Sequence, residues 1–455
     1  MAAPQTPEQE IWAKLYERFD PERPAFDKAW RVERKYSPAQ DIASELARPM
    51  GGPKRFMLLG GLGSGKSTEL YGIAEQRSAD GPVIFIDLVR HFEERVGDPA
   101  ALDRVHPWEI LLLVGLAVFH AGEASFGHQW TKAQREQFND AGRDFLEDDK
   151  DHPTFDVAKL ASAVFVLAGG AVGAAVGGPI GAGVGAGLAA TGQAGGGVQW
   201  RFKIGIPGRA PRSDQDARVQ KLLDVVNTLI GDLQAYGQKL TTFVDGLDRI
   251  DDRARIRALF IDSTLLGGLE CDVVLTGPIA LHRGSLRKHV RKFTTKILTN
   301  APVVDRLDPW SWEPGGPGID LCAEVYRRRT TDLPDDLVPD PLLRKLAYYS
   351  GGRMREFVKL LREIAGPAWD RSLKRADEAV VDRAIENMRE VTEAGLTKAH
   401  LGVLRELLAD PGELPESELV ADMLDVCLIL PYPNDSEWYL PHPLLLKTKL
   451  AKPGG

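Results

Sequence analysis

The amino-acid sequence predicts an α/β fold of three layers, with helices covering a parallel β-sheet. Four short apolar runs, at 56–59, 82–88, 241–245 and 271–277, are rich in β-branched residues and are bounded by Gly, Pro or Asp, which is typical of buried strands. The first run leads through a glycine-rich loop into a segment of helical character. Long stretches separate the runs, with room for the crossovers that parallel strands require.

The composition is that of a globular protein of two to three domains. Of the 455 residues, 43% are hydrophobic and 27% are charged, which excludes a disordered chain, a coiled-coil rod and a multi-span transporter. The net charge of −8 argues against a protein that mainly coats nucleic acid. Cys271, Cys322 and Cys427 lie far apart, so we expect neither a disulfide nor a zinc framework. The first residues include no apolar run, and we expect no secretory signal and a cytoplasmic location.

The strongest motif is a phosphate-binding loop that follows the first strand. It reads Gly60-x-x-x-x-Gly65-Lys66-Ser67 between a strand and a helix. Glycines let successive N–H groups point at phosphate oxygens, the lysine supplies a charge for the β- and γ-phosphates, and the serine hydroxyl can ligate Mg²⁺. The positive end of the following helix favours the same anion. The expected nucleotide-binding residues are Gly60, Gly61, Gly63, Ser64, Gly65, Lys66, Ser67 and Thr68.

The strand at 241–245 ends in the carboxylate that we expect to hold the metal. Asp245 is predicted to bind Mg²⁺ directly or through water, with Ser67 as the second protein ligand. A water-activating carboxylate often follows such an aspartate, but this chain has Gly246 there. Asp248 is the nearest replacement, and a plain surface ion pair is the open alternative for it.

Four segments then resemble the AAA+/STAND branch of P-loop ATPases: GGLGSGKS, FVDGLDR, VVLTG and SGGRMR at 350–355. A small residue after the metal aspartate, with an acidic residue two positions on, is similar to the NACHT variant of STAND proteins. Arg249 departs from that variant, which usually has a second acidic residue there. The resemblance covers 30–92 and 240–455, and relatives of this type often act in bacterial defence or signalling.

Two further residues are candidate readers of the γ-phosphate. Thr276 ends a strand at the carboxyl edge of the sheet, where ligands of open α/β sheets bind, and a plain strand-end hydroxyl is the alternative. The SGG-x-x-R segment resembles the start of a lid helix in origin-initiator ATPases, whose arginine reaches the γ-phosphate. That resemblance implies this role for Arg355, and a solvated arginine at a helix start is the alternative.

The chain is expected to fall into four parts. These are an N-terminal helical segment at 1–50, an ATPase core at 51–310, a helical lid at 311–392 and a winged-helix-like domain at 393–455. The core strands are separated by far more chain than a crossover needs, which predicts an insertion at 94–239. Apolar residues at three-to-four spacing predict the lid helices, and two helices followed by a hairpin predict the last domain.

Nucleic acid is not the favoured partner. The expected helix at 417–426 carries acidic residues but no Lys or Arg, which makes it a poor reader of DNA, because phosphate contacts supply much of DNA affinity. The basic stretch at 283–296 leaves three alternatives open: an arginine presented to a neighbouring subunit, a solvated helix face, or a nucleic-acid patch.

A glycine-rich segment at 160–200 interrupts the sequence between the two halves of the expected site. Thirteen of its residues are glycine, none is charged, and five glycines recur at every fourth position, as in a glycine zipper. These five are Gly169, Gly173, Gly177, Gly181 and Gly185. Three alternatives stay open: a flexible loop, a buried or self-associating helical hairpin, and a conditionally membrane-active segment.

Together these patterns predict an ATP-binding, Mg²⁺-dependent ATPase of slow turnover that acts as a conformational or assembly switch. We expect a homo-oligomer or an effector protein as partner, with membrane association through 160–200 as a further hypothesis. One alternative is a DNA-associated AAA+ initiator or motor. Another is a scaffold that binds ATP without turnover, which Gly246 favours.

Overall fold

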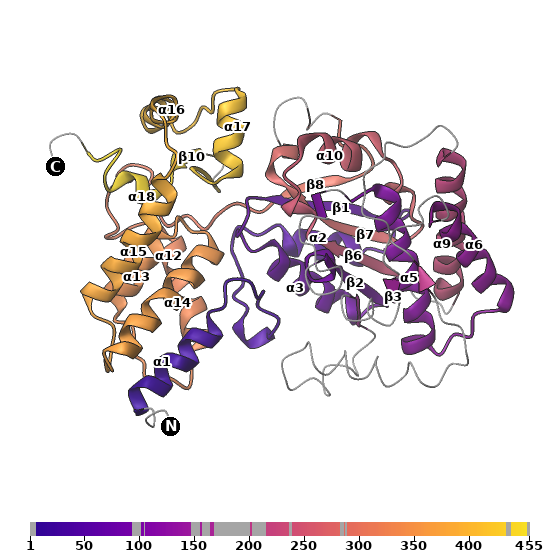
Figure 1. Ribbon diagram of the computed structural model, residues 1–455, viewed down its shortest axis with the longest axis horizontal. Helices are drawn as coiled ribbons and strands as arrows, with labels where there is room; N and C mark the ends of the chain where they lie inside the picture. The colour runs from indigo at the N-terminus through magenta and orange to yellow at the C-terminus, as the bar shows by residue number, and fades with distance from the viewer. Residues whose placement is uncertain are drawn as a thin grey trace. The chain divides into compact units, whose positions relative to one another are not determined.

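The computed structural model divides the chain into two compact units (Figure 1). The described residues are 6–92, 102–103, 105–146, 155–156, 164–167, 201–202, 215–235, 239–282, 286, 289–433 and 438–452. We call Pro38–Leu59 together with Glu69–Ile297 the sheet unit. Met1–Ser37, Gly60–Thr68 and Leu298–Gly455 form the helical unit. The glycine-rich loop thus belongs with the helical unit, and the four predicted domains stay a prediction.

Within the described residues, the main sheet has six strands in the order β4-β2-β6-β7-β1-β8. They are β1 Arg55–Gly60, β2 Val83–Asp87, β4 Val164–Leu167, β6 Thr241–Asp245, β7 Asp272–Pro278 and β8 Thr294–Ile297. Five of these six are parallel, and β4 pairs with β2 in the antiparallel direction. The four predicted strands are confirmed, as is the α/β class with a parallel sheet.

Strands β4 and β8 lie where the sequence predicts none. Strand β4 opens the glycine-rich segment and pairs Val164 with Ile86 of β2, a role that none of the three alternatives for that segment included. The remaining residues of this segment, 160–163 and 168–200, lie outside the described residues. Strand β8 is the end of the basic stretch and pairs with β1. Residues 283–285 and 287–288 of that stretch also lie outside the described residues.

Helices cover both faces of the sheet, which makes the three predicted layers. The helices of this unit are α2 Ala39–Ala47, α3 Lys66–Ser78, α4 Leu88–His91, α5 Pro107–Phe126, α6 Lys132–Leu146, α9 Gln215–Gln234 and α10 Arg253–Arg257. Short turns of helix are η5 Leu247–Arg249, η6 Ala258–Asp262, η7 Leu266–Gly268 and η8 Ile279–His282. Side chains along a strand alternate between the faces. Ile84 and Ile86 join the core around α5, whereas Phe85 stacks on Tyr71 of α3 with ring centroids 4.1 Å apart.

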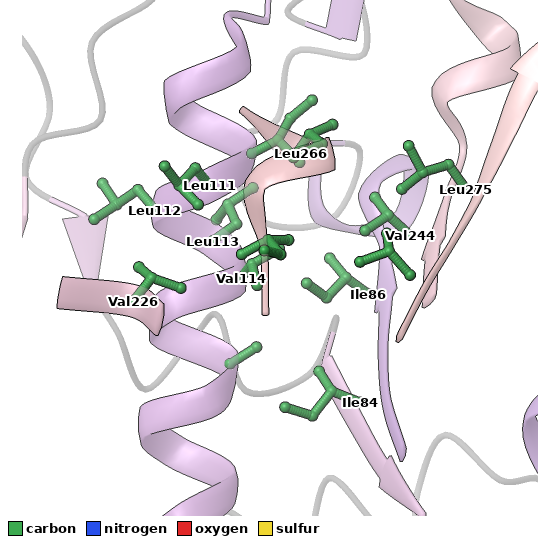
Figure 2. Packing of buried hydrophobic residues seen from close by; sticks show 14 of the residues in the cluster. Ile84, Ile86, Leu111, Leu112, Leu113, Val114, Val226, Val244, Leu266 and Leu275 are labelled. Carbon is green, nitrogen blue, oxygen red and sulfur yellow. The ribbon is translucent and has the colours of Figure 1, made fainter. Parts of the chain in front are cut away.

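Helix α5 forms the centre of this core. Figure 2 shows Leu111 to Val114 of α5 among side chains from β2, β6, β7, α9 and η7. The helix begins with a capping box, in which His106 N donates to Glu109 Oε2 at 2.7 Å, and it ends before Gly127 in the left-handed conformation. An apolar sequence on all sides suits burial between β2 and α9. Among the described residues no helix is both long and apolar enough to cross a membrane.

The helical unit has helices in the range 311–392, for which the sequence predicts a helical lid, and the lid assignment itself stays a prediction. Its elements are α1 Pro7–Arg18, η1 Lys28–Trp30, α12 Gly318–Arg329, α13 Asp340–Tyr349, α14 Met354–Asp370, α15 Glu378–Glu393, α16 Lys398–Ala409, α17 Glu418–Asp425, β9 Ile429–Tyr432, β10 Trp438–Pro441 and α18 Pro443–Leu446. Helix α14 is strongly amphipathic and buries Phe357, Leu361 and Ile364. Helix α1 packs along it, and Trp12 Nε1 donates to Leu373 O at 2.7 Å.

The last part of this unit has the elements that the sequence predicts. Helices α16 and α17 precede the antiparallel β9–β10 hairpin, and Ser417 caps α17 by accepting from Val420 N. Val420, Met423 and Leu424 of α17 are buried. The winged-helix assignment itself stays a prediction.

Candidate functional site

The glycine-rich loop leaves the sheet at the end of β1 and runs directly into α3. Gly63 and Gly65 have φ of +80° and +100°, conformations that other residues adopt only with strain. Gly60 has no room for a side chain, since a Cβ there would lie 2.7 Å from Leu298 O. The predicted strand, loop and helix are therefore present, and the glycines stand where the backbone requires them.

The backbone carbonyls of residues 60 to 64 all accept hydrogen bonds. Lys66 Nζ donates to Gly60 O at 2.8 Å and to Gly61 O at 2.9 Å. Arg353 Nη2 donates to Leu62 O at 2.8 Å, and Arg355 N donates to Gly63 O at 3.1 Å. Arg34 Nη1 donates to Ser64 O at 2.6 Å. A loop with alternating left-handed residues gathers its N–H groups on the opposite side as an anion-binding nest.

The remaining predicted loop residues differ in their surroundings. Lys66 is buried, with 3% of its surface exposed. Ser64 is also buried, and its Oγ has no hydrogen-bond partner within the part of the chain that the structure describes. Thr68 Oγ1 accepts from Ala25 N at 3.3 Å, which ties the start of α3 to the N-terminal segment. Ser67 follows Lys66 in the first turn of α3.

Arg355, the second candidate reader of the γ-phosphate, lies at this loop. Helix α14 begins after Gly351 and Gly352, which have φ of +62° and +73°. The Arg355 backbone contacts Gly63, where an added Cβ would lie 2.9 Å from the Arg355 Cβ. Its Nη2 lies 3.4 Å from Glu22 Oε2. Its assignment as a reader of the γ-phosphate stays a prediction.

A buried charged network that the sequence analysis missed lies behind the loop. Arg353 pairs with Glu356, and Glu356 Oε2 lies 2.7 Å from His442 Nε2. His442 Nδ1 accepts from Leu444 N, so Nε2 carries the ring proton and donates to the carboxylate. Burial opposes ionisation of Glu356, but the Arg353 charge and the hydrogen bond from His442 still lower its pKa. Arg353 and Glu356 are three residues apart, but His442 lies 86 residues from Glu356, so no spacing rule marks the whole network.

In the sheet unit, Asp245 and Thr276 share one backbone N–H. Gly246 N lies 2.9 Å from Asp245 Oδ1 and 2.9 Å from Thr276 Oγ1. Both side chains are buried, with exposures of 4% and 0%. Strands β6 and β7 are parallel neighbours, and the carboxyl ends of parallel strands lie at one edge of a sheet. The structure therefore brings these two predicted residues together at the edge where β1 also ends.

Gly246 explains why no carboxylate follows Asp245. Its φ is +96°, and a Cβ there would lie 2.8 Å from Val89 Cγ2 and 3.1 Å from Val89 N. A longer side chain is excluded by the backbone and by this contact. Asp248 lies two residues after Gly246, in the η5 turn, and is partly exposed.

A Tyr71 hydroxyl near this edge was also missed by the sequence analysis. The side chain comes from α3, and burial raises the pKa of Tyr71 well above its ordinary value, with the Asp87 and Asp245 carboxylates acting in the same direction. The raised pKa keeps the phenol neutral and able to donate a hydrogen bond.

The residues at Asp245 fit a magnesium ion better than a protein-only metal centre. In the described residues, no group of three or more His, Cys, Asp or Glu is placed to hold a metal. Mg²⁺ is commonly bound by one or two carboxylates together with phosphate oxygens and water. A single buried aspartate at the carboxyl end of a strand matches the carboxylate part of that donor set.

No protein-family model matches the sequence, and no curated protein matches it. Among solved structures, the chain is similar to the ORC1 protein of Aeropyrum pernix in complex with DNA, with 12% identity, a TM-score of 0.41, and coverage of 95% of this chain and 96% of that one. It is also similar to Cdc6p from Pyrobaculum aerophilum, with 14% identity, a TM-score of 0.35, and coverage of 95% and 96%. The RuvB branch migration motor of Thermotoga maritima matches with 14% identity and a TM-score of 0.26, over 50% of this chain and 75% of that one.

Proposed function

We propose that this chain binds ATP at residues 60–68 and uses binding and slow hydrolysis as a conformational switch. The observation that supports this most directly is the arrangement of the loop. Its carbonyls from 60 to 64 all accept from other groups, and Lys66 is buried against it. Such a loop offers N–H groups and positive charge to phosphate oxygens, and the helix α3 dipole favours the same ligand.

Each predicted residue has a role in this proposal. Lys66 neutralises the phosphates, while Ser67 and Asp245 would hold the Mg²⁺ that accompanies ATP. When bound, that ion supplies positive charge to the β- and γ-phosphates. Asp248 would orient and deprotonate the attacking water. Thr276 and Arg355 would respond to the presence of the γ-phosphate.

The switch part of the proposal follows from what holds the loop. Arg34, Arg353 and Arg355 bond it to N-terminal and C-terminal segments of the helical unit. A ligand that shifts this loop would therefore shift both segments through these hydrogen bonds. Loss of the γ-phosphate on hydrolysis would change the position of the loop again. A partner protein or further copies of this chain would read the change.

The test is titration with a fluorescent, non-hydrolysable ATP analogue in the presence of Mg²⁺. Lys66→Ala is expected to abolish binding, with affinity falling by about 100-fold or more, because a charge-assisted contact to phosphate is lost. Lys132→Ala is the matched control, because the Lys132 side chain is 89% exposed on α6. Equal affinities for the Lys66 variant and the unchanged chain would refute the site.

A further inference from the structure

We infer that Arg353, Glu356 and His442 form a positioning relay between the phosphate-binding loop and the C-terminal hairpin. Through this relay, nucleotide binding at the loop and docking of β9, β10 and α18 stabilise each other. The inference rests on the proposed function, and it adds the route by which the C-terminal segment regulates the site. All of its contacts lie within the helical unit.

At the loop end of the relay, one arginine fixes one carbonyl. Arg353 donates to Leu62 O from Nη2 at 2.8 Å and from Nε at 3.2 Å. The planar guanidinium can make this two-pronged contact while its Nη1 pairs with Glu356. The position of Leu62, and with it the neighbouring N–H groups, therefore depends on where Glu356 holds the arginine.

The middle of the relay is the tightly packed turn at Gly351 and Gly352, just before α14. Gly351 and Gly352 both have positive φ, and a Cβ on Gly352 would overlap Ala301 O. A Cβ on Gly351 would overlap Leu430 of β9 and approach His442 Nε2 to 3.0 Å. Tyr432 Oη also donates to Gly351 O at 3.0 Å. Movement of the hairpin therefore cannot be absorbed at this turn and is passed to the start of α14.

At the C-terminal end, His442 is fixed on three sides. It is 1% exposed, its backbone N donates to Leu428 O at 2.9 Å, and its two ring nitrogens contact Leu444 N and Glu356. The position of the His442 ring, and with it the hydrogen bond to Glu356, therefore depends on the positions of the hairpin and of α18.

The same segment also approaches the loop at a point that does not involve these charges. Cys427, between α17 and β9, is buried with its Sγ 3.9 Å from the position that a Cβ on Gly61 would take. The C-terminal segment thus lies close to the loop at Gly61 and is linked to Leu62 through the relay. Loss of the relay alone leaves the buried apolar residues of the helical unit unchanged, so the variants below are expected to fold.

The experiment compares Glu356→Gln with the unchanged chain in two measurements. The first is affinity for a non-hydrolysable ATP analogue, and the second is amide hydrogen exchange in β9 and β10 with and without that analogue. In the unchanged chain, the analogue is expected to slow exchange in the hairpin. In Glu356→Gln, affinity is expected to fall by about 5- to 150-fold, the usual range for coupled sites, and the analogue should no longer slow hairpin exchange.

Two further variants separate positioning from folding. His442→Gln keeps an N–H group for Glu356 and is expected to retain most of the coupling, whereas His442→Leu should lose it. Glu363→Gln is the matched control, since Glu363 lies two turns along the same helix and pairs with Lys359 instead. If Glu356→Gln does not fold, the two His442 variants decide the question.

The outcomes distinguish this inference from the proposed function. Normal analogue binding and normal hairpin protection in both Glu356→Gln and His442→Leu would overturn the relay and leave the nucleotide site standing. If the unchanged chain binds no analogue, the proposed function fails, and exchange at loop amides 61–65 without ligand then tests the relay. Faster exchange there in His442→Leu than in Glu363→Gln would support it, and equal rates would overturn it.

Discussion

The guanidinium of Arg34 lies against Gly65 and donates from Nη1 to Ser64 O at 2.6 Å. A Cβ on Gly65 would overlap Arg34 Nη2, so the arginine occupies the space beside the loop that only glycine leaves open. The N-terminal segment therefore takes part in shaping the glycine-rich loop, although it precedes the strand that leads into the loop.

Arg34→Ala is expected to weaken ATP-analogue affinity by about 10- to 100-fold. A hydrogen bond to a charged group contributes about 1.5 to 3 kcal/mol, and Ser64 O would lose this donor. Equilibrium titration measures the effect. Arg23→Ala is the control, because the Arg23 side chain is 76% exposed and pairs with Asp20. An Arg34 variant that binds as tightly as the control would show that the contact does not shape the loop.

Gly246→Ala tests whether the missing carboxylate is excluded by the backbone. We expect it to lower the free energy of unfolding by about 1 to 3 kcal/mol more than Gly395→Ala does. Both glycines have positive φ, +96° and +82°, but a Cβ on Gly395 meets nothing within 4 Å. The comparison therefore isolates the contact with Val89 from the strain of the left-handed backbone, which costs about 1 to 2 kcal/mol. Urea unfolding measures the free energy of unfolding of both variants. Equal losses would mean that the Val89 side chain moves aside and that the contact costs nothing.

Asp248→Asn decides between slow hydrolysis and a scaffold without turnover. If Asp248 activates water, single-turnover hydrolysis of ATP should slow by about 100- to 10,000-fold, the usual contribution of a general base. Asp252→Asn is the control, because Asp252 is exposed and asparagine preserves its capping of α10. Hydrolysis at an unchanged rate in Asp248→Asn would assign the base elsewhere. No hydrolysis in the unchanged chain would favour the scaffold.

The buried carboxyl of Glu109 should make the folding stability of the chain fall as the pH rises. Burial raises its pKa from 4.5 to about 8, although the His106 N–H and Arg255 act in the opposite direction. The folded chain then keeps a proton that the unfolded chain loses. The stability from this proton is complete below pH 4.5 and declines as the pH rises to about 8.

Glu109→Gln should remove that decline, because the amide cannot ionise and its oxygen still accepts from His106 N. Relative to the unchanged chain, the variant is expected to gain on the order of a few kcal/mol in unfolding free energy between pH 5 and pH 8. Chemical denaturation at several pH values measures this gain. Glu123→Gln, at a half-exposed site on the same helix, should follow the unchanged chain. Parallel curves for all three proteins would contradict the assignment.

The sequence predicted the parts of the fold that local patterns specify. Strands β1, β2, β6 and β7 are buried apolar runs, and the loop has a fixed spacing of glycines and lysine. Strand β8 was not predicted, because Thr294 to Ile297 are partly exposed and include a lysine, so they do not form an apolar run. Strand β4 was not predicted, because it lies near the start of a glycine-rich stretch whose composition favours a loop or a helix.

The site divides in the same way. Lys66, Asp245 and Thr276 follow strands or lie in a motif, and Arg355 follows a pair of glycines that mark a helix start. Glu356 and His442 are 86 residues apart, and Arg353 is 291 residues from Leu62. Only tertiary packing brings such pairs together, so the periodicity of apolar residues and the spacing of motifs in the sequence cannot predict them.

This separation along the chain has a consequence for synthesis on the ribosome. Leu62 is translated 291 residues before the arginine that holds its carbonyl, and Cys427 and His442 come later still. At about 5 to 20 residues per second, the interval is roughly 15 to 60 seconds. During that time the nascent chain carries a complete glycine motif without its C-terminal supports. Under the proposed function, competence to bind nucleotide is therefore expected only after the segment that contains His442 has been synthesised.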